Sequence, residues 1–184
     1  PATLLLLRQR AYDRLQLGVE WLMLGLAMLL AWRIGVSIDA LLVLGVMGFF
    51  MLIAVIDLKY RLILNIVTYP AFIIAVIMQV VILPDALLNV VIGGVFAFGI
   101  FFIVAQMKPD DLGGGDVKLA ALIGVIFGFP NMLWALIVGG TVGALAAIYL
   151  VVRGSSTLRS YIPYAPFLCT GAMVALMYNP LTMG

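Results

Sequence analysis

The chain has 184 residues, of which 66% are hydrophobic and only 10% are charged, and its mean hydropathy is +1.27. Soluble domains are about 45–50% apolar and about 25% charged, so this composition excludes a soluble globular protein and indicates an integral membrane protein. The net charge is +2 and the basic residues are scattered along the chain, which excludes a nucleic-acid-binding surface.

The sequence has no histidine, and Cys169 is its single cysteine. These facts exclude Ser-His-Asp and Cys-His nucleophilic catalysis, ordinary zinc sites and a disulfide framework. Any chemistry must therefore use carboxylates, hydroxyls, Lys, Arg or the backbone, and we expect neither a metal nor a cofactor.

Long apolar runs without period-2 alternation predict transmembrane helices, each of which needs about 20 residues to cross the bilayer. The expected fold is therefore an all-α polytopic membrane protein with one membrane-embedded domain over residues 1–184. An additional N-terminal helix within 1–38 would precede a core over 39–184. The seven expected helices cover about residues 15–35, 39–58, 66–83, 86–107, 116–128, 131–152 and 162–179.

The placement of Lys and Arg predicts the orientation of these helices. With a cytoplasmic N-terminus, nine of the ten basic residues fall on the cytoplasmic side, as the positive-inside rule requires. We therefore expect a multi-pass protein of the inner membrane with its N-terminus in the cytoplasm. The nine are Arg8, Arg10, Arg14, Lys59, Arg61, Lys108, Lys118, Arg153 and Arg159, and Arg33 lies outside.

The expected fifth helix, 116–128, is too short to cross the bilayer alone. Its thirteen residues span about 20 Å, whereas the hydrocarbon core is about 30 Å thick. Asp116, which begins this segment, is thus expected near or below the cytoplasmic interface. Polar, glycine-rich backbone at that depth has to be surrounded by protein or by a water-filled cavity.

Asp57 closes the apolar run FFMLIAVID at the cytoplasmic end of the second expected helix, at the same depth as Asp116. Ionisable residues at such positions are costly, which makes both aspartates candidates for function. Two carboxylates in a poorly solvated site cannot both ionise easily, so one stays protonated and the other charged. Such a pair can hydrolyse a peptide bond without metal, thiol or imidazole. Asp39 and Asp85 precede apolar runs, where aspartates cap helices.

Gly113, Gly114 and Gly115 stand directly before Asp116. Glycines accept positive φ and let a bound chain approach closely, so these three could present a substrate peptide or act as the hinge of Asp116. The alternative is a plain loop before a helix that Asp116 caps. The local sequence leaves both interpretations open.

Three stretches, in the same order, resemble motifs of the type IV prepilin peptidases, which are membrane aspartyl proteases with a GxGD signature. GGGDVKLAALIG is similar to that signature, DLKYRLILN to the stretch around the first aspartate and its downstream Asn, and IPYAPFL to a C-terminal IP(F/Y)GPFL element. The matching residues are Asp57, Asn65, Gly113, Gly115, Asp116, Lys118, Ile162, Pro163, Tyr164, Pro166, Phe167 and Leu168.

The resemblance implies that Asp57 and Asp116 are the catalytic pair. It implies a prepilin or pseudopilin substrate, cleaved between its basic leader and its apolar helix, with membrane lipid as the surrounding partner. Asp110 and Asp111 are candidates for binding the basic leader, and a solvated acidic loop is the alternative for them. The resemblance leaves the oligomeric state open.

The chain departs from the family pattern at two motif positions, since Leu64 replaces a proline and Ala165 replaces a glycine. It also lacks the four-cysteine cytoplasmic domain of the long bifunctional members. The resemblance is therefore to the short, peptidase-only form found with tight-adherence pilus systems, and we do not expect N-methyltransferase activity.

Two other functions use the same aspartates. A proton- or cation-coupled transporter would place them in a relay, although both are expected near one face rather than at the midplane. A preflagellin or presenilin-like protease would share the chemistry with another substrate. Lys118 has a simpler interpretation as a snorkelling side chain, and Tyr164 as an interfacial aromatic anchor. The glycines of the fourth and sixth helices are expected to serve helix packing.

Overall fold

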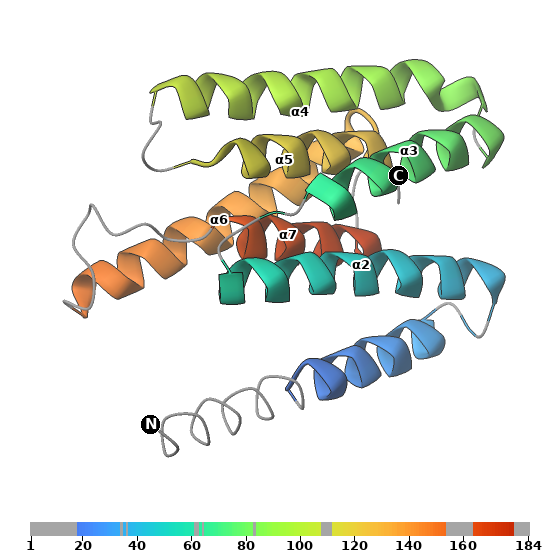
Figure 1. Cartoon of the computed structure of the whole chain (residues 1–184). Helices are drawn as coiled ribbons and strands as arrows, with labels where there is room; N and C mark the ends of the chain where they lie inside the picture. The colour runs from blue at the N-terminus through green and yellow to red at the C-terminus, as the bar shows by residue number, and fades with distance from the viewer. Residues whose placement is uncertain are drawn as a thin grey trace. The chain divides into compact units, whose positions relative to one another are not determined.

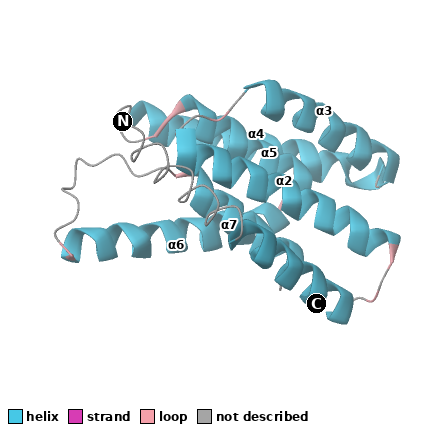
Figure 2. Ribbon diagram, turned by 60° about the horizontal axis from the view of Figure 1, so that its bottom comes forward, coloured by secondary structure: helices cyan, strands magenta, loops and turns pink. Residues whose placement is uncertain are grey.

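The computed structural model describes residues 18–33, 35, 37–60, 63, 65–82, 84–107, 112–153 and 164–178. Within these ranges the protein is all-α, which confirms the expected polytopic fold (Figures 1 and 2). A first helix covers residues 18–33. The others are α2 (Ile38–Tyr60), α3 (Asn65–Ile82), the 3₁₀ turn η1 (Pro84–Ala86), α4 (Leu87–Met107), α5 (Gly114–Phe127), α6 (Asn131–Val152) and α7 (Ala165–Met177).

The chain divides into two compact units, Pro1–Met51 and Leu52–Gly184, with the boundary inside α2. The domain division at residue 38 stays a prediction. In the first unit, Ser37 caps α2, because its Oγ accepts a hydrogen bond from the Ala40 N–H at 3.1 Å. Asp39, expected to be the cap, instead lies in the first turn of α2, where its charge favours the helix dipole.

In the part of the chain that the structure describes, three segments are long and apolar enough to cross a membrane: α2, η1 with α4, and α6. The helices over Asn65–Val81 and Ala165–Met177 are apolar but shorter. Large apolar side chains such as Val95 and Ile103 are exposed along α4, as lipid-facing positions of a membrane helix are. The expected helix bounds agree with the structure to within a few residues.

Helix α5 is the buried centre of the second unit. It has 14 residues, about 21 Å of helix, which confirms that it is too short to cross alone. It ends at Gly128, where φ is 65° and a side chain would be strained. Its buried residues are Asp116, Val117, Leu119, Ala120, Ala121, Leu122, Ile123, Gly124 and Val125.

Glycines bring the helices of this unit into close contact. A Cβ on Gly93 of α4 would lie 2.5 Å from the carbonyl oxygen of Gly124 in α5, and α4 runs along α5 (Figure 1). In the same way, a Cβ on Gly139 of α6 would lie 2.9 Å from the carbonyl oxygen of Phe167 in α7. The expectation that glycines serve helix packing is confirmed for Gly93 and Gly139, because a larger side chain would separate the backbones, whereas Gly99 of α4 has nothing within 4 Å of its Cβ position.

Candidate active site

Asp57 lies in the last turn of α2, within the second compact unit, and only 5% of its surface is exposed. It follows the buried Ile53 and Ala54 and precedes the exposed Leu58, Lys59 and Tyr60. The helix therefore carries this carboxylate at the point where its buried face ends. This is the position that the apolar run before Asp57 predicts.

Asp116 is the third residue of α5 and is 4% exposed. Its Oδ2 accepts a hydrogen bond from the Gly113 N–H at 3.2 Å, and its own N–H donates to the Gly113 carbonyl oxygen at 3.0 Å. This is the reciprocal arrangement of a capping box, in which the acidic residue stands at the third helical position. The helix-capping interpretation of Asp116 is therefore correct, and α5 begins at Gly114 rather than at Asp116.

The two aspartates lie within electrostatic reach of each other, because the charge of Asp57 acts directly on Asp116. They are separated by more than fifty residues and come from the end of α2 and the start of α5. Both belong to the same compact unit. Two like charges that are both buried repel each other at a high cost in free energy.

Helix α7 and the residue directly before it each place one side chain beside this pair. Cys169 is fully buried, lies against the backbone of Ala54, and interacts electrostatically with both aspartates. The charge of Asp116 also acts on Tyr164, which directly precedes α7. The sequence placed Cys169 in an apolar stretch with no partner. The one sequence feature that points to its position beside the carboxylates is the IPYAPFL motif, which ends directly before Cys169.

Tyr164 is more than the interfacial anchor that we expected. The side chain is half-buried, and its ring lies 6.1 Å from that of Phe101 in α4, measured between centroids. A Cβ on Gly140 of α6 would lie 3.7 Å from the Tyr164 hydroxyl. Tyr164 therefore packs between α4 and α6 and interacts electrostatically with Asp116.

The glycines before Asp116 do not use their conformational freedom in this structure. Gly113 has φ −78° and ψ 152°, which any residue can adopt, and Gly114 and Gly115 are the first residues of α5. None of the three has a positive φ in this structure. Gly115 lies close to another segment of the chain itself, since a Cβ there would lie 2.9 Å from Cβ of Ile63. A role of these glycines in substrate binding or as a hinge stays a prediction.

Lys118 does not simply extend toward lipid headgroups, as we expected. Its Nζ donates a hydrogen bond to Oδ1 of Asn65, the first residue of α3, at 2.9 Å. The same ammonium lies 5.1 Å from the centroid of the Tyr69 ring, which is cation–π geometry. Two sequence motifs that are 53 residues apart are thus joined by a side-chain contact.

Several expected features lie outside the residues that the structure describes. They include the candidate leader-binding residues and parts of two motifs. These are Asp110, Asp111, Leu64, Ile162 and Pro163.

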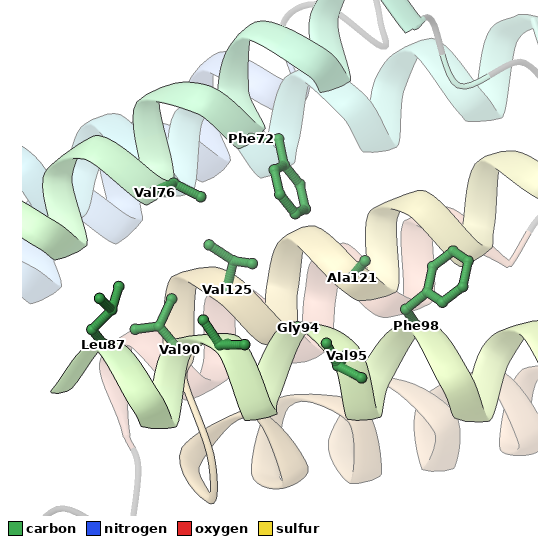
Figure 3. Close-up of a pocket in the computed structure, with 10 residues that line it drawn as sticks. Phe72, Val76, Leu87, Val90, Gly94, Val95, Phe98, Ala121 and Val125 are labelled. Carbon is green, nitrogen blue, oxygen red and sulfur yellow. The ribbon is translucent and has the colours of Figure 1, made fainter.

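An apolar pocket of about 350 Å³ lies between α3, α4 and α5, away from both aspartates (Figure 3). In Figure 3, Phe72 of α3 and Val125 of α5 point into the space above α4, which Leu87 and Val90 line. Because the residues lining this pocket are all apolar, it offers no catalytic group.

Residues 44–148, which include both aspartates, match the model of the type IV leader peptidase family. A prepilin leader peptidase/N-methyltransferase of Pseudomonas putida is 26% identical over 84% of this chain and 55% of its own length. Proteins of the same name from Bacillus subtilis and Vibrio cholerae are 26% and 31% identical, over 80% and 70% of this chain.

The chain spans about half the length of the curated relatives that it matches, between 52% and 59% for these three. No solved structure matches the chain.

Proposed function

The chain belongs to the type IV leader peptidase family, and from this premise we propose that it is an aspartic endopeptidase that removes the leader of a prepilin or pseudopilin. The observation that carries the proposal is the pair of buried carboxylates, Asp57 and Asp116, held within electrostatic reach by two separate helices. The names of the relatives support the substrate, since they describe prepilin leader peptidases.

In the proposed mechanism, the charged member of the pair takes a proton from a water molecule, which attacks the scissile carbonyl carbon. The protonated member donates a hydrogen bond to the carbonyl oxygen and stabilises the negative charge that develops there. The proton taken from water is then passed to the leaving nitrogen as the peptide bond breaks. The mechanism needs one carboxyl group protonated and the other charged. Repulsion between two buried negative charges favours this state.

The proposed cleavage takes place at the cytoplasmic face of the inner membrane. The distribution of Lys and Arg supports this orientation, since nine of ten basic residues would face the cytoplasm. A substrate with a basic leader and an apolar helix would have its junction at the same depth as the two aspartates. Asp110 and Asp111 are proposed to attract the leader, and the segment Gly113–Gly115 to lie along the bound peptide.

The names of the relatives include a second activity, that of an N-methyltransferase. Our proposal concerns peptide-bond hydrolysis within the part of the relatives that this chain matches. That the chain does not methylate its product stays a prediction, which a mass measurement of the new N-terminus would check.

The test is cleavage of a prepilin from the same source, co-expressed with the chain and analysed by mass spectrometry. The wild-type chain is expected to cut just before the apolar segment, and Asp57→Asn and Asp116→Asn are each expected to abolish the cut. Asp85→Asn is the matched control, because Asp85 is exposed in η1 and far from the pair in sequence. Cleavage by either site variant would disprove the dyad, and an inactive wild type would favour a transporter.

A further inference from the structure

The first turns of α5 are fastened to the segment that follows Asp57. Ile63 packs against Gly115 so closely that a Cβ there would be 2.9 Å from Cβ of Ile63. Two residues after Ile63 and three residues after Gly115, Asn65 accepts the hydrogen bond of Lys118. Two independent contacts therefore hold the same pair of segments together, and each segment lies within eight residues of one aspartate.

Lys118 and Asp116 point to different sides of α5, because residues two apart on a helix are separated by about 200°. Asp116 is directed into the buried interior, whereas Lys118 reaches the start of α3. A bond on the α3 side therefore fixes the rotation of α5 about its own axis. If α5 turned, the Asp116 carboxylate would move relative to Asp57, which belongs to α2.

From this arrangement we infer that Lys118 and Asn65 form a clamp that positions Asp116 against Asp57 for catalysis. This inference rests on the proposed peptidase function and adds two residues to it. The clamp acts through geometry: the Lys118–Asn65 bond and the Gly115–Ile63 contact set the distance and the angle between the carboxylates. Lys118 and Asn65 are positioning residues, because neither is expected to touch the scissile bond.

The chain offers a matched control at the opposite end of α5. Gln79 of α3 donates its side-chain N–H to the carbonyl oxygen of Ile126 at 2.6 Å, and it also reaches Val125 at 3.4 Å. Gln79 therefore joins the same two helices by the same kind of contact, three turns away from Asp116. If the two contacts served only stability, removing either one should have the same effect on kcat.

The experiment measures kcat and KM for prepilin cleavage by the full chain in detergent, per folded molecule, for four single variants and one double variant. Lys118→Met and Asn65→Ala are each expected to lower kcat about tenfold to a hundredfold, since small displacements of a catalytic group have effects of this size. KM should stay within about twofold. Lys118→Arg should restore most of the rate, and Gln79→Met should keep it. The double variant Lys118→Met/Asn65→Ala should be no slower than either single variant, because both remove one contact.

A second measurement reports the position of α5 without catalysis. Gly114→Cys carries a nitroxide label at a position where a Cβ has nothing within 4 Å. The native Cys169 is fully buried, and the chain without Gly114→Cys measures any background signal from labelling of Cys169. Lys118→Met and Asn65→Ala are expected to increase the mobility of this label, and Gln79→Met is not.

The outcomes separate the clamp from the proposed function. If the wild type cleaves, the aspartate variants do not, and Lys118→Met keeps the full kcat, the clamp is disproved and the peptidase stands. An equal loss of kcat in Gln79→Met would also overturn it, by showing a purely structural effect. A wild type without activity on the prepilin would refute the proposed function and the clamp together.

Discussion

Gly115 of α5 and Ile63, two residues before α3, lie in direct contact, and a single methyl group on Gly115 would come within 2.9 Å of Cβ of Ile63. The neighbouring Gly114 has open space around it. Two adjacent glycines of one motif therefore have different reasons to be glycine, and substitution can separate them.

Gly115→Ala is expected to slow prepilin cleavage about tenfold or more, because the Ile63 contact must open and the Asp116 carboxylate shifts with it. Gly114→Ala should slow cleavage less than Gly115→Ala, since its Cβ has open space in the structure and alanine favours the helix by about 0.5–1 kcal/mol. Cleavage rates of both purified variants check the pair. Equal rates for the two would show that the Ile63 contact does not control the site.

Asp57→Asn and Asp116→Asn are expected to abolish cleavage without lowering stability. Each replacement removes one of two like charges that are buried within reach of each other, and an amide at position 116 can still accept the hydrogen bond from Gly113. Asp116→Ala loses that cap as well and should be less stable than Asp116→Asn by about 0.5–2 kcal/mol. Thermal unfolding in detergent compares the three variants. An Asp116→Asn chain that unfolds more easily than Asp116→Ala would contradict the capping role.

Cys169 is expected to take no part in the chemistry, although it lies beside both aspartates. Its side chain is fully buried, so a maleimide reagent should not react with the folded chain or inhibit cleavage. Cys169→Ala should keep activity within a few-fold, whereas Cys169→Phe should abolish it by overpacking the site. Activity before and after maleimide treatment checks the first point. Inhibition of the wild type that Cys169→Ala escapes would mean that the thiol is accessible to the reagent.

The seam between α4 and α5 is expected to control the stability of the second compact unit. Gly93→Ala would push a methyl group into the backbone of α5, which should cost about 1–3 kcal/mol of unfolding free energy. Gly99→Ala lies on the same helix with nothing within 4 Å of its Cβ, so it should be neutral or slightly stabilising. Unfolding curves of the two variants measure the difference. Similar curves would indicate that the helices separate without penalty.

The sequence was informative about the helices, because they depend on local features. Apolar runs define membrane helices, whereas the placement of both aspartates at one membrane face, which the distribution of basic residues predicts, stays a prediction. The start of α5 was misplaced by two residues, since Asp116 acts at the third helical position of a capping box. At α5 the positive φ belongs to Gly128, which follows the far end of the helix, and not to the glycines before Asp116.

Side-chain contacts between distant segments could not be predicted. The Lys118–Asn65 bond joins residues 53 apart, and no periodicity in the sequence pairs them. The same holds for Cys169, which reaches the aspartates only because α7 packs beside the end of α2. A single sequence shows which side chains are polar, but the partners of each depend on helix rotation and packing.

The shortness of α5 has a consequence for the biogenesis of the protein. A segment of 14 residues that begins with two glycines and an aspartate is a poor substrate for independent insertion by the translocon. Helix α4, in contrast, is part of a 24-residue apolar span and already carries the glycine surface on which α5 packs. We therefore expect α5 to enter the bilayer together with α4 as a helical hairpin. The carboxylate of Asp116, which we propose to be catalytic, would then reach its depth only after the preceding helix has been delivered to the membrane.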